Sequence, residues 1–300
     1  SKYDFRRSVE DGATVPLYYE NRGEKLKLDN PEITEQIKDT IEKHDLDENQ
    51  EEKLKNMFSR EYPILTAEKR LRSIARDVVY HFCERGYKGK AMFVAIDKLT
   101  AVRMHDYITE EIGNYIRENE NKISDSDMKW IKETEVNVVV SGEQNEIKKF
   151  RDWGYDIESH RLKMNTRDLE KEFKDEENPF RMAIVCAMWI TGFDVKSLST
   201  LYIDKPLKAH TLMQTIARAN RVHEGKNNGL IVDYIETYKA LLSALAIYGD
   251  SSSKGGDESP VKPIEELVED LKESVDKIDL FLKDQCQFDI NSIVEEENNL

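Results

Sequence analysis

The feature that most limits the fold is a series of short, predominantly apolar runs separated by longer amphipathic stretches. The runs cover residues 91–96, 136–140, 182–186, 198–203 and 229–232. A strand that is apolar on both faces is buried on both faces, which is typical of parallel sheets covered by helices. Strands that alternate with helices pair in parallel through right-handed crossovers. The sequence therefore predicts one α/β domain over 61–250, with a parallel sheet flanked by helices.

The stretches between the runs have helical spacing. Leu71, Ile74, Val78 and Phe82 form one apolar stripe, which predicts a helix after Thr66. Further helices are expected over 99–116, 143–153 and 209–220, and a polar segment is expected before residue 182. A first short strand is expected before a turn at residues 21–23.

Two acidic segments flank this domain. Residues 1–60 combine the first strand with a charged segment in which Ile33, Ile37 and Ile41 have helical spacing. Residues 251–262 are rich in Gly, Ser and Asp, and this composition predicts a flexible linker. Residues 263–300 place an apolar stripe on an acidic helix, which predicts the start of a C-terminal helical region. Such a stripe packs either on this domain or on another part of a longer protein.

The net charge of −15 does not exclude nucleic acid as a partner. Residues 28–60 carry −5 and residues 263–300 carry −9, so the rest of the chain is almost neutral. A nearly neutral domain can still present a basic stripe to phosphates.

Cysteine usage and hydropathy indicate a cytoplasmic protein. No run of eighteen apolar residues is present and the first twenty residues have no apolar core, so neither a membrane span nor a secretory signal is expected. Cys83, Cys186 and Cys286 lack ligand spacing, which argues for a reducing compartment and against a zinc site. No metal site is expected, because the six histidines are scattered along the sequence.

The segment HTLMQTIARANR, residues 210–221, concentrates basic and amide groups. On a helix, Gln214, Arg218 and Arg221 fall at i, i+4 and i+7 within a narrow arc. The opposite side would face a core through Leu212, Ile216 and Ala219. Two guanidiniums without an interleaved acid suit a ligand with several anionic oxygens, such as a triphosphate. The alternative is a solvated cationic face paired with distant acids.

A second segment, VCAMWITGFDV, takes an apolar strand into Thr191-Gly192-Phe193-Asp194. Gly192 has access to backbone conformations closed to other residues, so the chain can approach a ligand closely there. Asp194 is expected at the carboxyl end of a parallel strand, where α/β sheets bind their ligands. The alternative is an ordinary turn in which Asp194 accepts local N–H groups.

Taken together, the two segments resemble motifs five and six of superfamily 2 helicases and translocases. Residues 91–101 and 138–144 (VVVSGEQ) are similar to the fourth motif and the segment that follows it. The resemblance implies a RecA-like domain that closes over ATP and Mg²⁺ held by a separate first motor domain. It implies that Arg218 and Arg221 are finger arginines, that Gln214 orients them, and that Gly192 and Asp194 line the nucleotide cleft.

The same resemblance implies contacts to the DNA backbone. Ser141 and Gly142 follow a strand where relatives touch the tracked DNA strand, and Thr191 and Lys98 are further candidates. Backbone N–H groups, hydroxyls and ammonium groups bind phosphate without reading sequence. A plain turn and a solvated lysine are the alternatives.

Three longer stretches narrow the family. Residues 8–22, 186–222 and 229–249 look like the motor subunit of type I restriction enzymes, in the family's order. This implies the second motor domain of a double-stranded DNA translocase that works with a nuclease domain, a first motor domain, and methyltransferase and specificity subunits. The pattern departs from many relatives at Ala217 and Asn220, where glycines are common, and at Ala187, where an acid is common.

Several motifs that a complete motor needs are absent from the sequence. There is no Gly-x-x-x-x-Gly-Lys-Ser/Thr loop for phosphates, no Asp-Glu-x-His/Asp box for magnesium, and no Pro-Asp dipeptide of the family's nuclease. The chain alone is therefore predicted neither to hydrolyse ATP nor to cut DNA. Two other functions remain open: another superfamily 2 motor, or a non-catalytic docking domain.

Overall fold

The computed structural model describes residues 8–9, 11–25, 62–190, 192–207, 209–235 and 261–286. Contacts divide the chain into two compact units, residues 1–260 and 261–300. The acidic segment expected within 28–60, most of the expected linker, and Thr191 lie outside the described residues.

Six parallel strands build the first unit, in the order β3-β4-β2-β5-β6-β1. Their bounds are β1 Leu17–Asn21, β2 Lys90–Ala95, β3 Glu135–Val139, β4 Phe180–Val185, β5 Leu198–Asp204 and β6 Gly229–Asp233. All five apolar runs that predicted strands form strands, and the expected α/β class with a parallel sheet is confirmed. The strand from the start of the chain belongs to the same sheet, because β1 pairs with β6.

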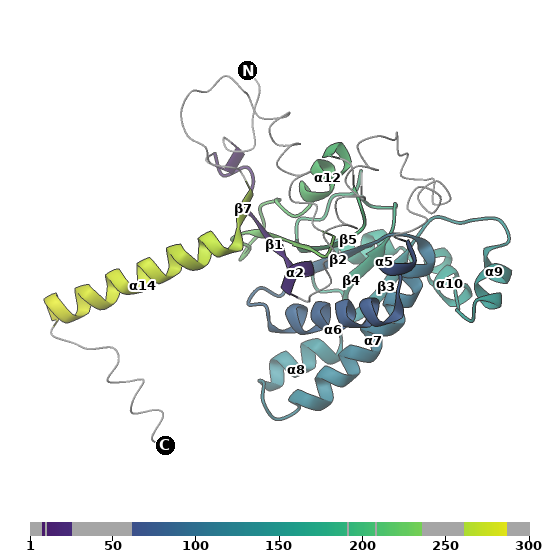
Figure 1. Cartoon of the computed structure of the whole chain (residues 1–300), viewed down its shortest axis with the longest axis horizontal. Coiled ribbons are helices and arrows are strands. Elements are labelled where there is room, and N and C mark those ends of the chain that lie inside the picture. Colours follow the sequence, from purple (N-terminus) through teal and green to yellow (C-terminus); the bar gives the residue numbers. More distant parts are fainter. Residues whose placement is uncertain are drawn as a thin grey trace. The chain divides into compact units, whose positions relative to one another are not determined.

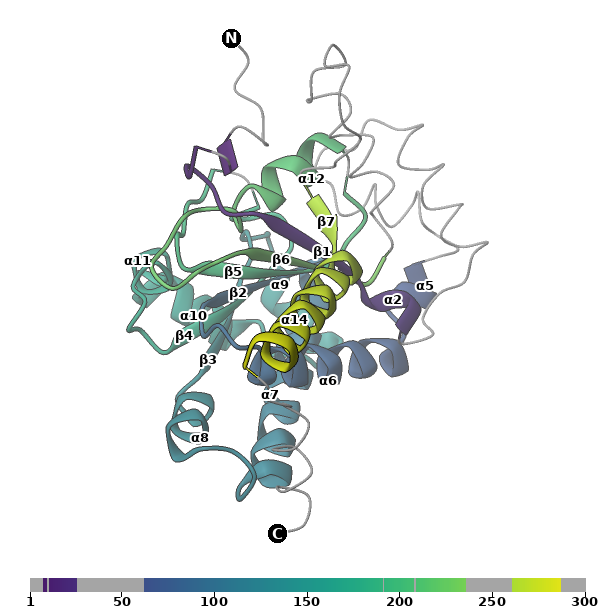
Figure 2. The same ribbon diagram turned by 90° about the vertical axis from the view of Figure 1, so that its left-hand side faces the viewer.

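Helices cover both faces of this sheet (Figures 1 and 2). On one face lie α6 (Glu68–Glu84) and α7 (Lys98–Asn119), and α12 (Ala209–Ile216) lies on the other. The shorter helices are α2 (Arg22–Lys25), α5 (Tyr62–Leu65), α8 (Asp125–Lys132), α9 (Glu146–Asp152), α10 (Glu158–Thr166) and α11 (Leu169–Lys174). In place of the turn predicted at residues 21–23, β1 ends at Asn21 and α2 begins at Arg22, and the polar segment before β4 contains α10 and α11.

The core forms because successive strand residues point to opposite faces. Phe93, Ile184 and Tyr202 point toward the stripe of α6, and all four stripe residues predicted from the sequence are buried there. On the other face, Leu212, Ile216 and Ala219 are fully buried, as predicted. Each fully buried large apolar side chain contributes about 1.5–3 kcal/mol.

The second unit consists of β7 (Val261–Pro263) and α14 (Ile264–Cys286). The helix confirms the helical spacing of the C-terminal stripe, and Val268, Leu271, Val275 and Ile278 are exposed on it. Within the described part of the chain, no helix combines the length and hydropathy needed to cross a bilayer.

Candidate functional site

Because the six strands are parallel, the sheet has one edge of strand beginnings and one of strand ends, here called the amino edge and the carboxyl edge. The structure gathers the candidate residues at both edges. Asp194, Arg218 and Arg221 form an arginine cluster at the amino edge. Lys98, Ser141 and Gly142 lie at the carboxyl edge, where they follow β2 and β3.

The arginine cluster is held together by an ion pair. Arg221 Nε lies 3.2 Å from Asp194 Oδ1. Arg218 is close enough for both charges to act on it: burial lowers its pKa, Asp194 acts in the opposite sense, and Arg221 lowers it further. Arg218 Nε is buried and makes no hydrogen bond within the described residues. Three residues from two distant segments therefore converge on one spot.

Backbone pairing fixes this spot at the amino edge. Arg221 forms an isolated antiparallel bridge with Thr14, and Val15 N donates to Asn220 O at 2.7 Å, just before β1 begins. Next to this bridge, Gly229 begins β6, and a Cβ on it would lie 2.2 Å from the carbonyl oxygen of Ala219. The segment with both arginines is therefore fastened to the beginnings of β1 and β6.

The expected position of Asp194 at the carboxyl end of a strand is wrong. After β4 ends at Val185, the chain runs back along the sheet before β5 begins at Leu198. Asp194 is near the end of this return, beside Arg221 and close to the beginning of β5. The side chain thus lies at the opposite edge from the one that strand order alone suggests.

The helix expected over 209–220 ends earlier, at Ile216. Arg218 N donates to Thr215 O and Ala219 N to Ile216 O, so the chain tightens into turns with i to i−3 bonds. The pairing with residues 14 and 15 draws the backbone out of the helix. Arg218 and Arg221 consequently do not share a helical arc with Gln214, which is half-buried on α12. Tertiary pairing, and not helical spacing, brings the arginines together.

The exposure of the cluster decides what it can do chemically. The side chains of Arg221 and Asp194 are 47% and 51% exposed. An exposed ion pair contributes roughly 0–1 kcal/mol, so Arg221 can exchange Asp194 for another anion at little cost. A guanidinium binds a phosphate through two parallel N–H donors. The cluster is thus suited to an anionic ligand brought by another molecule or domain.

The loop before Asp194 has an unusual backbone. Gly192 has φ +75°, and a Cβ there would meet no atom within 4 Å, so the backbone conformation and not a close contact requires glycine. Trp189 also has a positive φ, of 67°, and its ring stacks on Phe193 with centroids 4.1 Å apart. This stack accompanies the reversal of the chain toward the amino edge. Nothing in the local sequence pattern predicts this stack.

At the carboxyl edge, Lys98 lies beside the loop that follows β3. Lys98 Nζ is 3.2 Å from Glu143 Oε2, Ser141 is half-buried and Gly142 is exposed. Partial burial acts to raise the pKa of Glu143, but Lys98 and then Lys149 outweigh it and the pKa lies below its ordinary value. The candidate DNA-contact residues are brought together, although an acid accompanies the lysine.

Arg161 holds this loop in place and was not found from the sequence. Its guanidinium donates to Val140 O and to Ser141 O, both at 2.5 Å, and it pairs with Glu146. Glu146 in turn accepts the backbone N–H of Glu143 at 3.1 Å. No local sequence pattern identifies Arg161, because it lies on α10, about twenty residues after the loop that it contacts. In the local sequence, only the three-residue spacing of Glu143 and Glu146 indicates that the conformation of the loop is fixed by a hydrogen bond.

A comparison of the chain with models of known protein families shows the family to which it belongs. The family model of type I restriction enzyme subunit R domain 3 matches residues 15–236. The chain belongs to this family. The match includes both the arginine cluster and the loop after β3.

Curated relatives carry the same description. A protein of Methanocaldococcus jannaschii named as a type I restriction enzyme MjaIXP endonuclease subunit is 34% identical over 285 residues, which cover 94% of this chain and 25% of that protein. The type I restriction enzyme HindI endonuclease subunit of Haemophilus influenzae is 31% identical over 308 residues, 99% of this chain and 26% of that protein. The chain thus spans about a quarter of the length of these relatives.

Solved structures of lower similarity were also found. A fragment named as an HsdR subunit of a type I restriction enzyme from Vibrio vulnificus YJ016 has a TM-score of 0.48 and 14% identity, covering 87% of this chain and 38% of that chain. The Type ISP restriction-modification enzyme LlaBIII bound to DNA has a TM-score of 0.44 and 11% identity, covering 87% and 16%.

Proposed function

We propose that this type I restriction enzyme domain is the second motor domain of an ATP-dependent double-stranded DNA translocase. In this proposal a first motor domain elsewhere in the same subunit holds ATP and Mg²⁺, and this domain presents Arg218 and Arg221 to the phosphates. The observation that carries the proposal is the convergence of both arginines at an exposed place on the amino edge. An arginine there stabilises charge that develops during phosphoryl transfer.

The other residues have supporting roles in the proposal. Asp194 pairs with Arg221 before the nucleotide arrives, and Gly192 shapes the adjoining loop. The role of Gln214 in orienting the arginines rests on the family resemblance alone, because α12 ends before Arg218. The nuclease domain, methyltransferase subunit and specificity subunit are the proposed partners. The chain by itself is proposed to be inactive toward ATP and DNA, because its sequence lacks the phosphate loop, the magnesium box and the nuclease motif.

The test uses the full-length subunit assembled with its partner subunits. Arg218→Ala and Arg221→Ala are each expected to lower DNA-stimulated ATP turnover by about 10³–10⁵-fold with an unchanged thermal unfolding temperature. Arg151→Ala is the matched control, because Arg151 forms an exposed surface pair with Glu158 at 3.2 Å. Its turnover should equal that of wild type.

The same experiment separates the motor from a docking domain. Wild-type turnover in both arginine variants, with subunit assembly intact, would mean that the domain serves as a platform. Loss of turnover without loss of assembly supports the motor.

For DNA we propose that Lys98 and the backbone at Ser141 and Gly142 contact phosphates. Lys98→Ala should then weaken DNA binding equally for all sequences and reduce the salt slope by about 1. Lys129→Ala is the control, because Lys129 is exposed on α8, which precedes β3, whereas Ser141 and Gly142 follow β3. A lower unfolding temperature with an unchanged salt slope would mean that Lys98 only stabilises the loop through Glu143.

A further inference from the structure

A cluster of two histidines and an aspartate lies outside both edges discussed above. His105 and Asp106 come from α7 and His160 from α10, and one potential ligand atom of each lies within 4.8 Å of the other two. The imidazole rings are 4.5 Å apart between centroids and nearly perpendicular. His105 Nδ1 is 3.2 Å from Asp106 Oδ1. The histidines are scattered in the sequence, and only the fold brings this pair together.

His160 supplies a second and independent observation. Its side chain is 5% exposed, and its Nδ1 is buried without a hydrogen-bond partner in the described structure. A buried polar atom without a partner costs about 1–3 kcal/mol, so most such atoms have one. A ligand that accepts the nitrogen lone pair would remove this cost.

The geometry points to a divalent transition-metal site, and we propose that His105, Asp106 and His160 bind Zn²⁺ or a similar ion. In a tetrahedral zinc site with ligand distances of about 2.0–2.1 Å, neighbouring ligand atoms are about 3.3 Å apart. His105 Nδ1 and Asp106 Oδ1, which share a hydrogen bond in this structure, are 3.2 Å apart, close to this separation. The potential ligand atom of His160 lies within 4.8 Å of the other two, so metal binding would draw the three side chains closer together.

The donor set selects the class of metal. Two imidazoles and one carboxylate suit Zn²⁺, Co²⁺ or Ni²⁺, whereas Mg²⁺ and Ca²⁺ prefer oxygen donors. Three protein ligands leave a fourth position for water.

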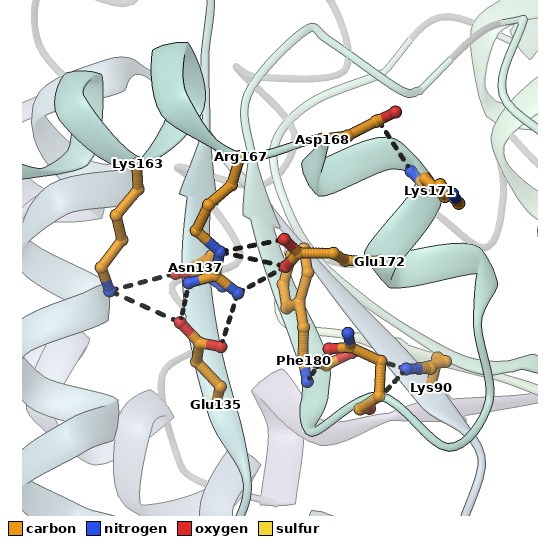
Figure 3. A network of polar contacts seen from close by, with 10 residues as sticks. Lys90, Glu135, Asn137, Lys163, Arg167, Asp168, Lys171, Glu172 and Phe180 are labelled. Carbon is orange, nitrogen blue, oxygen red and sulfur yellow. Dashed lines mark hydrogen bonds and ion pairs between the residues drawn. The ribbon is translucent and has the colours of Figure 1, made fainter.

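Polar contacts connect α10, the helix that carries His160, to both ends of β3. Near the carboxyl edge Arg161 binds the carbonyls of Val140 and Ser141. Near the amino edge Arg167 donates to Glu135 at 2.5 and 2.8 Å, and Lys163 donates to Asn137 at 3.2 Å, as Figure 3 shows. The position of His160 relative to α7 is therefore fixed by polar contacts on both sides.

A bound metal would tie together the two helices that control the loop after β3. One of them, α7, begins at Lys98, which pairs with Glu143 in this loop. The other, α10, carries Arg161, which holds the loop's carbonyls. Metal binding should therefore slow the opening of residues 140–146. This consequence does not depend on the proposed motor function.

The test titrates the complete 300-residue chain, free of any affinity tag, with Co²⁺ as a spectroscopic probe and Zn²⁺ as competitor. We expect one equivalent of Co²⁺ to bind with ligand-field bands of nitrogen and oxygen donors, and Zn²⁺ to displace it. Zinc should also reduce amide hydrogen exchange in residues 140–146. Thiolate charge-transfer bands would instead place the metal on cysteine and overturn the proposal.

Variants decide whether these side chains are the ligands. His105→Ala and His160→Ala should abolish stoichiometric binding, and Asp106→Asn should raise Kd by about tenfold or more. His105 is half-buried and Asp106 is exposed, so their variants remain informative if His160→Ala fails to fold. His223→Ala is the control, because His223 pairs with Glu176 at the amino edge. No saturable binding by wild type, or equal binding in His105→Ala, would overturn the proposal.

Discussion

A buried ion pair between α6 and β5 provides the sharpest test of how this domain is held together. Arg70 and Asp204 are 9% and 2% exposed, and their side chains form two bonds of 2.6 and 3.1 Å. The same guanidinium donates to Leu65 O at 2.9 Å and to Tyr234 O at 3.0 Å. Arg70 thus joins α5, α6, the end of β5 and the end of β6.

Arg70→Met removes the cation and leaves a buried carboxylate without a partner. Breaking such a pair costs about 3–5 kcal/mol, and the two carbonyls that lose a donor add about 1 kcal/mol each. A typical domain has only about 5–15 kcal/mol of stability, so the loss should be plain. The double variant Arg70→Met/Asp204→Leu should recover much of the loss, because it no longer buries a charge.

The pH dependence of the single variant follows from the same carboxylate. Burial already raises the pKa of Asp204 in the wild-type chain, against the effect of Arg70. Without Arg70 the folded-state pKa should rise further above the unfolded value, so the folded state binds a proton more readily. The cost of Arg70→Met should therefore shrink as the pH falls toward 5.

The assay is urea unfolding followed by tryptophan fluorescence, because Trp130, Trp153 and Trp189 all lie in the first unit. Arg72→Met on the same helix is the control. Arg72 forms exposed pairs with Glu68 and Glu110, both at 2.9 Å, and should cost under about 1 kcal/mol. An Arg70→Met cost as small as the control, or one that does not depend on pH, would refute the reasoning.

Three further outcomes are expected. Burial, and then His105, lower the pKa of His160 from 6.5 to about 4 in the folded chain. As the pH falls between these two values, the unfolded chain takes up a proton at His160 before the folded chain does, so the folded state loses stability. With a chelator present, the free energy of unfolding should fall by about 2 kcal/mol more between pH 7 and pH 5 in wild type than in His160→Leu. Gly229→Ala should destabilise the domain by about 1–3 kcal/mol in urea unfolding, because the new Cβ meets the Ala219 carbonyl, while Gly86→Ala, with open space around it, should not. Asn145 has φ 61°, so thermal unfolding of Asn145→Gly should match wild type and Asn145→Ala should cost about 1–2 kcal/mol; equal effects would count against the left-handed conformation.

The strands were predictable because a strand buried on both faces appears in the sequence as a run of mostly apolar residues. Every residue of β2 and β4 is buried, and apart from Lys90 and Arg181 every residue of these strands is apolar, so few other elements fit them. The helix α6 was predictable for the same reason, through its apolar stripe. By contrast, α10 and α11 bury few side chains, His160 in the first and Leu169 and Phe173 in the second, and their periodicity is too weak to detect.

The candidate site was predictable in its residues but not in its geometry. The pattern of glycine, aspartate and arginines identified side chains that do meet, Asp194 and Arg221 among them. The early end of α12 depends on pairing with Thr14 and Val15, which are about two hundred residues away in the sequence. The edge at which Asp194 lies depends on the return of the chain along the sheet between β4 and β5. Local spacing carries no information about such contacts.

The pairing of β1 with β6 also sets the order in which the domain is made. Leu17 pairs with Gly229, so the first strand of this sheet waits for about two hundred residues before its partner is synthesised. At about 5–20 residues per second this interval is about 10–40 s. The contacts of Thr14 and Val15 with the arginine segment close in the same step, so a nascent chain released too early has a partial sheet and no arginine cluster. The part of the domain proposed to act in turnover is thus the last to be assembled during synthesis.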